Sequence, residues 1–198
     1  MRLTRLAVLL MAFGVPAAWG QWEVAPDGRG VTVTTPTLRA TFRDGSLVSL
    51  ENRTGAGSLF VERPESQVAP ALKDAEGFNS ADATNDISVT REGEGARISL
   101  RGLAGDATAR LALDLGVEAD GALTVRESGE REAPRLLSAS WGIAGIDAAR
   151  TRIVVLANGG CEIDALRGPG ALPLSWPGSW QAALIVLQGE KGGFYVWA

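Results

Sequence analysis

The strongest constraint on the fold is an alternation of apolar and polar residues along this 198-residue chain. The stretch LRATFR at 38–43 is a clear case, and the same period recurs at 97–101, 109–115, 123–125 and 137–143. Successive side chains of a strand point to opposite faces of a sheet, so a period of two is typical of strands that are buried on one side only. The pattern therefore predicts an all-β chain.

Turn-forming residues separate these strands. Asp44-Gly45 and Asp120-Gly121 are typical of tight hairpins, because such turns need positive φ angles that glycine adopts freely. The longest region without a strand pattern is 64–85, where we expect a surface loop with one helical turn near 71–76. Many short strands joined by turns predict a two-sheet antiparallel β-sandwich that occupies residues 21–198.

Three later segments, 152–156, 180–187 and 193–198, are apolar at consecutive positions. Such runs are typical of strands that are covered on both faces. The last run ends at Trp197-Ala198 without a polar tail, and it would be an unprotected sheet edge unless something covered it. We therefore expect a longer polypeptide in which this final strand packs against a domain that follows.

The first twenty residues have the layout of a secretory signal peptide. Arg2 and Arg5 precede an apolar run over 6–15, and small residues end the segment at Gly20. The run is shorter than the roughly 20 apolar residues that span a bilayer. We predict cleavage after Gly20, export to the periplasm or the extracellular space, and no membrane-spanning segment.

Composition narrows the possible partners. The formal net charge is −4, with 19 Lys and Arg against 23 Asp and Glu and no histidine. Because no basic cluster is present to neutralise phosphates, we do not expect nucleic-acid binding. Both methionines lie in the predicted signal peptide, and Cys161 is the only cysteine, which excludes an intramolecular disulfide. We expect no cofactor and no zinc or copper site, since the usual ligands are missing.

Two stretches resemble a known family. LRATFRDGSLVSLENRTG at 38–55 is similar to the opening hairpin of galactose-mutarotase-like supersandwich domains. PGSWQ at 177–181, followed by GGFYV at 192–196, is similar to a run in the N-terminal sandwich domains of large secreted bacterial glycoside hydrolases. The resemblance implies a supersandwich fold. It also implies that a catalytic TIM barrel follows in the same polypeptide and is the partner of this domain.

The resemblance assigns no catalytic residue. The barrel that carries the family's catalytic carboxylates has no counterpart in this sequence. The mutarotases use a histidine and a glutamate, and this chain has no histidine. We therefore expect no catalysis by this chain alone.

Candidate site residues are aromatic or acidic. Trp176 and Trp180 flank a Pro-Gly-Ser loop and are candidates to stack on a sugar, although burial in the core or against the missing domain is the ordinary role of such side chains. Glu162 and Asp164 share a strand face and form the nearest approach to the carboxylate pair that glycosidic cleavage needs, although acidic residues are usually solvated charges. The triplet that begins at Asn52 is interpreted as a turn.

Three functions remain open from the sequence. The first is a non-catalytic accessory domain of a secreted carbohydrate-active enzyme, packed on a catalytic domain and in contact with carbohydrate. The second is a stand-alone carbohydrate-binding or surface-interaction module. The third is a β-sandwich polysaccharide hydrolase or lyase.

Overall fold

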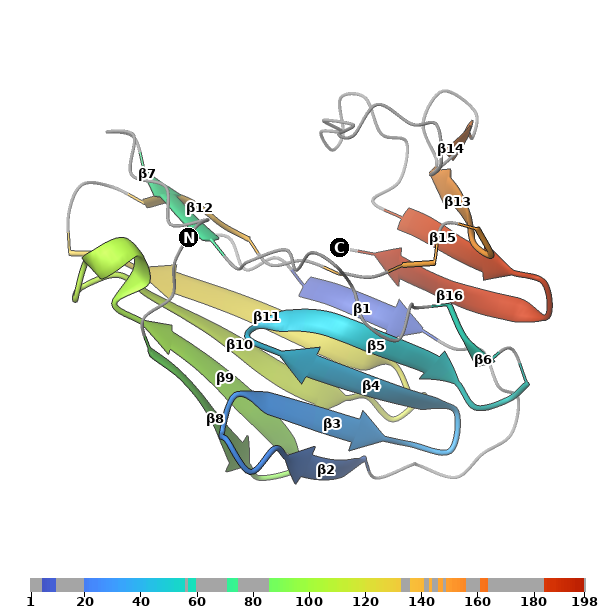
Figure 1. Ribbon diagram of the computed structural model, residues 1–198, viewed down its shortest axis with the longest axis horizontal. Helices are drawn as coiled ribbons and strands as arrows, with labels where there is room; N and C mark the ends of the chain where they lie inside the picture. The colour runs from blue at the N-terminus through green and yellow to red at the C-terminus, as the bar shows by residue number, and fades with distance from the viewer. Residues whose placement is uncertain are drawn as a thin grey trace.

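Figure 1 shows the computed structural model of the chain. The structure describes residues 5–9, 20–55, 57–59, 71–74, 86–132, 136–140, 143, 146–147, 149–155, 161–163 and 184–197.

One layer is a five-stranded antiparallel sheet in the order β2-β3-β4-β5-β6. Its strands are β2 (Gln21–Val24), β3 (Gly30–Thr34), β4 (Leu38–Arg43), β5 (Ser46–Asn52) and β6 (Gly57–Ser58). The β4–β5 turn has positive φ at both Asp44 (51°) and Gly45 (83°), which is the conformation that matches the twist of a two-residue hairpin. The predicted Asp44-Gly45 hairpin is confirmed.

The other layer is a nine-stranded antiparallel sheet in the order β14-β13-β15-β16-β1-β11-β10-β9-β8. Its strands are β1 (Arg5–Leu9), β8 (Asp86–Glu92), β9 (Gly95–Arg101), β10 (Arg110–Val117), β11 (Leu123–Glu130), β13 (Arg152–Val155), β14 (Cys161–Ile163), β15 (Leu184–Gly189) and β16 (Gly192–Trp197). β7 (Ala71–Asp74) and β12 (Leu136–Ser140) form a separate two-stranded sheet. Among the described residues the only helical element is a single 3-10 turn at Leu103–Gly105.

The core lies between the two layers. Figure 1 shows β2–β5 in front of the β8–β11 part of the larger sheet. Val33 and Phe42 from the front layer and Ile98 and Leu113 from the back layer are fully buried in one continuous apolar cluster. Each such side chain contributes roughly 1.5–3 kcal/mol by leaving water. The predicted all-β, two-sheet antiparallel sandwich is confirmed.

β7 differs from the prediction of a helical turn near residues 71–76. Ala71–Asp74 is a strand that pairs with β12, and Ala71 and Leu72 are both buried. The pairing satisfies backbone groups of a four-residue segment that a single helical turn would leave largely unsatisfied. The prediction of a helical turn is wrong for these four residues.

β1 comes from the predicted signal peptide. In the uncut chain, Arg5–Leu9 pairs with β11 on one side and with β16 on the other. Both edges of β1 are therefore paired, and β1 is an interior strand of the larger sheet. These five residues are thus part of the larger sheet in the uncut chain, and cleavage after Gly20 stays a prediction.

β16 is an interior strand, because β15 and β1 pair with its two edges. In the uncut chain, β1 therefore covers the edge of β16 at Tyr195–Trp197, which would otherwise be unprotected. The two faces of β16 differ. Phe194 and Val196 are buried in the core, whereas Tyr195 and Trp197 point the other way and are partly exposed. The prediction that this segment is covered on both faces holds for the core side only.

Asn52 ends β5 and fixes the turn that follows. Its Oδ1 accepts hydrogen bonds from the backbone N–H of Thr54 (2.8 Å) and from the Thr54 hydroxyl (2.7 Å). Its amide nitrogen donates to the Gly193 carbonyl (3.4 Å), which joins the front sheet to β16. Asn52 is only 7% exposed, and its interpretation as a turn residue is confirmed.

Candidate functional site: a charged groove on the outer sheet face

A row of small side chains crosses three strands on the face of the larger sheet that points away from the core. The register places Ala112 of β10 beside Ser99 of β9 and beside Ser128 of β11. We call these three residues the small-residue row. Their neighbours along the strands, such as Leu100 and Leu111, are buried on the opposite side. The row is therefore the outward half of the same alternation that builds the core.

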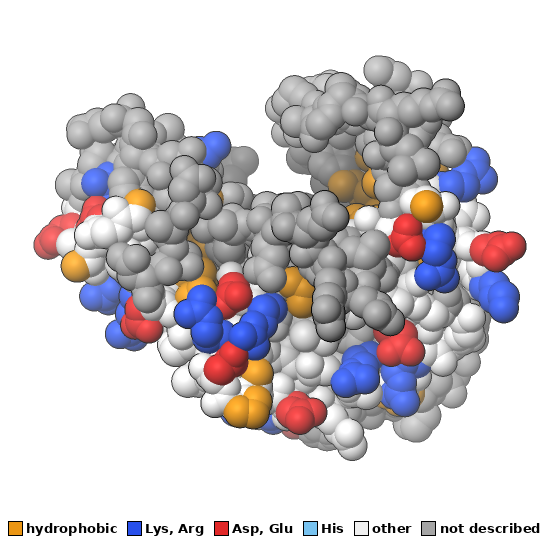
Figure 2. Space-filling view, viewed as in Figure 1, with side chains coloured by type: hydrophobic (Ala, Val, Ile, Leu, Met, Phe, Trp, Pro, Cys, Tyr) orange, Lys and Arg blue, Asp and Glu red, His pale blue; other side chains and the backbone are white. Residues whose placement is uncertain are grey.

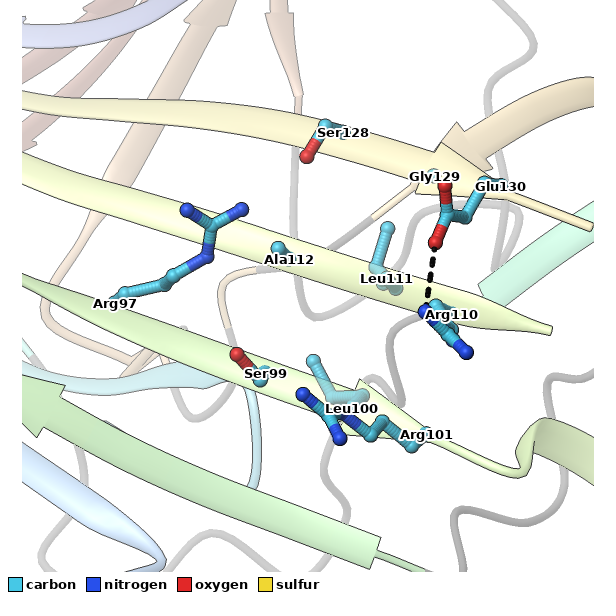
Figure 3. A pocket seen from close by; sticks show the side chains of 10 residues that line it. All are labelled: Arg97, Ser99, Leu100, Arg101, Arg110, Leu111, Ala112, Ser128, Gly129 and Glu130. Atoms are coloured by element: carbon cyan, nitrogen blue, oxygen red, sulfur yellow. Dashed lines mark hydrogen bonds and ion pairs between the residues drawn. The ribbon is translucent and has the colours of Figure 1, made fainter. Parts of the chain in front are cut away.

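Longer charged side chains flank the small-residue row. Arg97 lies two positions before Ser99 on β9, and Arg101 lies two positions after it. On the side of Arg101, the neighbouring strands contribute Arg110 of β10 and Glu130 of β11. The register pairs Arg110 with Arg101 on one side and with Glu130 on the other. Because the small side chains of the row lie between longer charged side chains, they leave a groove of about 290 Å³ (Figure 3).

Two of the arginines have unused donors. Figure 3 shows the guanidinium groups of Arg97 and Arg101 extending from opposite ends toward the small-residue row. Arg97 lies 3.6 Å from Asp114 and 3.8 Å from Glu92, and these ion pairs are longer than hydrogen bonds. The Arg101 side chain has no ion pair or hydrogen bond within the described ranges. Each guanidinium has five N–H donors, so both side chains can donate hydrogen bonds to an external ligand.

Arg110 is partly neutralised. Its guanidinium lies 3.3 Å from the Glu130 carboxylate, and both side chains are more than half exposed. Exposed pairs of this kind contribute about 0–1 kcal/mol, so a ligand anion can compete with Glu130 for Arg110. The groove therefore holds three guanidinium groups and one carboxylate among the described residues that line it.

A second hollow adjoins the groove at Arg110 and Glu130. It measures about 360 Å³ and is also lined by Thr108 and Arg131. Arg131 donates to the Asp106 carboxylate at 2.6 Å, and this contact, together with hydrogen bonds from Thr108, lowers the pKa of Asp106 to about 2. The two hollows share a wall, which gives the surface the extended shape that suits a chain-like ligand.

Glu127 lies on the other face of the sheet, in phase with the buried side chains of Leu123 and Val125. Its Oε2 is buried and has no hydrogen-bond partner among the described residues. Burial raises the pKa of Glu127 to about 7. A carboxyl perturbed in this way is often found at a functional site. Ser128 faces the groove and Glu127 faces the core, so Glu127 takes no part in the groove.

The predicted site residues fall outside this groove. Trp176, Trp180 and Asp164 lie outside the described residues. Glu162 belongs to β14, where its backbone pairs with Val154 at the far edge of the larger sheet. These four residues therefore remain predictions, and the groove is a different surface.

The groove residues escaped sequence reasoning because polar outward positions of a strand look like ordinary solvated side chains. One signal was present. If the hairpin that joins 97–101 to 110–115 is closed in the observed register, Ser99 falls opposite Ala112 and Arg101 falls opposite Arg110. Aligning strand partners, rather than inspecting each strand alone, would have placed two arginines beside a gap.

A second surface is apolar. The strands β13, β15 and β16 turn a set of partly exposed side chains away from the core, and the register places them side by side. Tyr195 and Trp197 are in ring contact, with centroids 5.6 Å apart. We call this set the outer apolar face, and its members are Val154, Leu184, Val186, Tyr195 and Trp197.

Over the rest of the visible surface the charges are mixed. On the face drawn in Figure 2, the described Lys and Arg side chains lie beside Asp and Glu side chains and form no large area of one sign. Within the described part of the chain, no cluster of three or more His, Cys, Asp or Glu residues could hold a metal ion. The described residues also include no helix with the length and apolarity needed to cross a membrane.

The chain was compared with protein families, curated proteins and solved structures. No family model, no curated protein and no solved structure matches it.

Proposed function

We propose that this chain is a non-catalytic accessory domain of a secreted carbohydrate-active enzyme and that its groove contacts carbohydrate. The groove is the observation that carries the proposal. Ser99 and Ser128 offer hydroxyl groups that have no hydrogen-bond partner within the described residues, and such groups suit the hydroxyls of a sugar. The Ala112 methyl offers the apolar contact that a sugar ring also needs.

The outer apolar face supports the accessory role. Five partly exposed apolar side chains on three paired strands form the kind of surface that packs against another domain. In this proposal the occupant is the catalytic domain of the same longer polypeptide, which the resemblance to N-terminal sandwich domains also implies. Export of the whole polypeptide belongs to the same proposal and rests on the signal-peptide layout of residues 1–20.

Carbohydrate contact is tested by affinity electrophoresis of the chain through gels that contain neutral and acidic polysaccharides. We expect retardation in at least one gel, and we expect Ala112→Trp to abolish it because the indole fills the groove. Arg39→Trp is the matched control, since Arg39 is exposed on the outer face of the other sheet. Free migration in every gel would refute carbohydrate contact.

A stand-alone binding module is the second candidate, and the outer apolar face distinguishes it from an accessory domain. The polypeptide encoded by the complete natural reading frame is expressed beside residues 1–198. Amide hydrogen exchange in β15 and β16 is then compared between the two polypeptides. An accessory domain predicts slower exchange there in the longer polypeptide. Unchanged exchange, or a reading frame that stops at Ala198, favours the stand-alone module.

A further inference from the structure

We infer that the ligand of the groove is an anionic polysaccharide, a chain whose sugars carry carboxylate or sulfate groups. This inference rests on the proposed carbohydrate contact and specifies the class of carbohydrate. Its starting point is a contrast of charge. The whole chain is acidic, with a net charge of −4, whereas the described residues that line the groove include three arginines and one glutamate, and the Asp114 and Glu92 carboxylates beside Arg97 lie at 3.6 and 3.8 Å from it.

The donors in the groove suit oxyanions. Planar guanidinium groups bind carboxylate and sulfate oxygens through two parallel N–H bonds, which are about twice as strong as neutral hydrogen bonds. Arg97 and Arg101 keep such donors free, and both turn toward the small-residue row (Figure 3). An anionic group that lies over Ser99 would therefore meet a guanidinium from either end of the groove.

The spacing of the arginines suits a polymer that carries repeated charges. Arg97 and Arg101 are four residues apart on one strand, which corresponds to roughly 13 Å along β9. Arg110 lies on the next strand and borders the second hollow as well. A chain with an anionic group on successive sugars can thus contact several guanidinium groups in turn, which a single small anion cannot do.

Two other ligand classes fit less well. A neutral polysaccharide is usually held by aromatic rings that stack on the sugar, and none of the described residues that line the groove is aromatic. Single-stranded nucleic acid also relies on aromatic stacking within an extended basic surface, whereas the acidic chain supplies three arginines locally. The combination of guanidinium and hydroxyl donors without aromatic rings favours an acidic glycan.

The inference is tested by calorimetric titration of the full chain with polygalacturonate, its methyl-esterified neutral form, dextran sulfate and plain dextran. We expect at least one charged polymer to bind about tenfold or more tightly than its neutral counterpart, a difference that rising salt reduces. Whichever charged polymer binds more tightly identifies carboxylate or sulfate as the preferred group.

Variants locate the site. Arg97→Gln and Arg101→Gln are each expected to weaken binding about tenfold, and Ala112→Glu is expected to abolish it by placing a negative charge in the floor. Arg39→Gln removes an exposed positive charge from the other sheet and is expected to leave binding unchanged. Circular dichroism confirms that each variant is folded.

The outcomes separate the two proposals. Equal affinity for the charged and neutral polymers overturns the inference and leaves the proposed carbohydrate contact in place. Binding to none of the four polymers removes both. An equal loss in Arg39→Gln, or single-stranded DNA bound as tightly as the charged glycan, shows general charge attraction and overturns the inference.

Discussion

At the scale of single residues, Glu127 combines an ionisable carboxyl group with a partly buried position. Alternation along β11 turns it toward the core together with Leu123 and Val125, where its Oε2 has no hydrogen-bond partner among the described residues. Removing a carboxylate from water disfavours its charged form, which is why its pKa rises from 4.5 to about 7. The folded state therefore binds this proton more tightly than the unfolded state does.

The sign of this linkage gives a prediction for Glu127→Gln. Because the pKa of Glu127 is raised in the folded state, its contribution to the free energy of unfolding is fully present at a pH below the ordinary glutamate pKa. That contribution is lost as the pH rises toward about 7. The neutral variant should therefore be more stable than the parent at about pH 8, by roughly 1 kcal/mol because partial exposure screens the charge. Below about pH 4 the two should be nearly equal. Urea unfolding across this pH range measures the difference.

Glu190→Gln is the control for this prediction, because Glu190 is exposed in the β15–β16 turn. Its effect should stay within about 0.5 kcal/mol at every pH. A free-energy difference between Glu127→Gln and the parent that does not change with pH would show that Glu127 is well solvated in the folded state.

Sequence reasoning predicts the side on which a strand residue lies better than it predicts what that residue does. The alternation at 38–43 and 97–101 predicts the buried positions of β4 and β9, and the structure confirms them. The groove depends in addition on which residues of neighbouring strands lie side by side. The pairing register decides which residues become neighbours, and the sequence of one strand alone does not determine that register.

At the scale of strands and turns, register depends on a few positions where backbones approach closely. Gly95 opens β9, and a Cβ atom there would lie 2.2 Å from the Leu115 carbonyl oxygen of β10. No side chain fits at that distance unless the two strands separate. Gly95 therefore allows the β9–β10 pairing on which the small-residue row depends.

Gly95→Ala should destabilise the chain by about 1–3 kcal/mol through this clash, as measured by urea unfolding. Gly116→Ala is the matched control within the same pair of strands. Its Cβ would meet only the Thr124 hydroxyl, at 3.0 Å, and that side chain can rotate away. Similar losses in the two variants would mean that β9 and β10 adjust easily and that close backbone approach does not fix their register.

Elements with a full alternation or a run of apolar residues are predictable, since the apolar runs at 152–156, 180–187 and 193–198 overlap β13, β15 and β16, whereas a short segment with neither pattern is not. The predicted strands at 38–43, 97–101 and 109–115 correspond to β4, β9 and β10. β7 has only four residues, too few to show a period, and its pairing with β12 depends on a contact distant in sequence. Tertiary context decides the structure of such segments.

At the scale of the whole molecule, the larger sheet has two parts that meet at β1. β8–β11 form one part, β13–β16 form the other, and β1 pairs with both β11 and β16. Since β1 lies in the predicted signal peptide, the uncut chain and the secreted chain would differ in the middle of this sheet.

A chain that begins at Gln21 tests this difference. We expect it to fold, because the described core residues of the front layer and of β8–β11 form one continuous apolar cluster with one another. The backbone groups of β11 and β16 that pair with β1 lose their partners, so their amides should exchange roughly tenfold or more faster. Hydrogen exchange read by mass spectrometry compares the two chains, with β3 and β4 as internal controls. Equal exchange in β11 and β16 would contradict this prediction.

The outward position of the small-residue row has an evolutionary consequence. Residues on that side of the strands contribute little to the buried layer, since Ser99 and Ala112 alternate with the leucines and the isoleucine that fill it. Mutations there can therefore accumulate at small cost in stability. A lineage that carries this scaffold can change its preferred ligand by point substitution alone, while selection for folding acts almost entirely on the other side of the same strands.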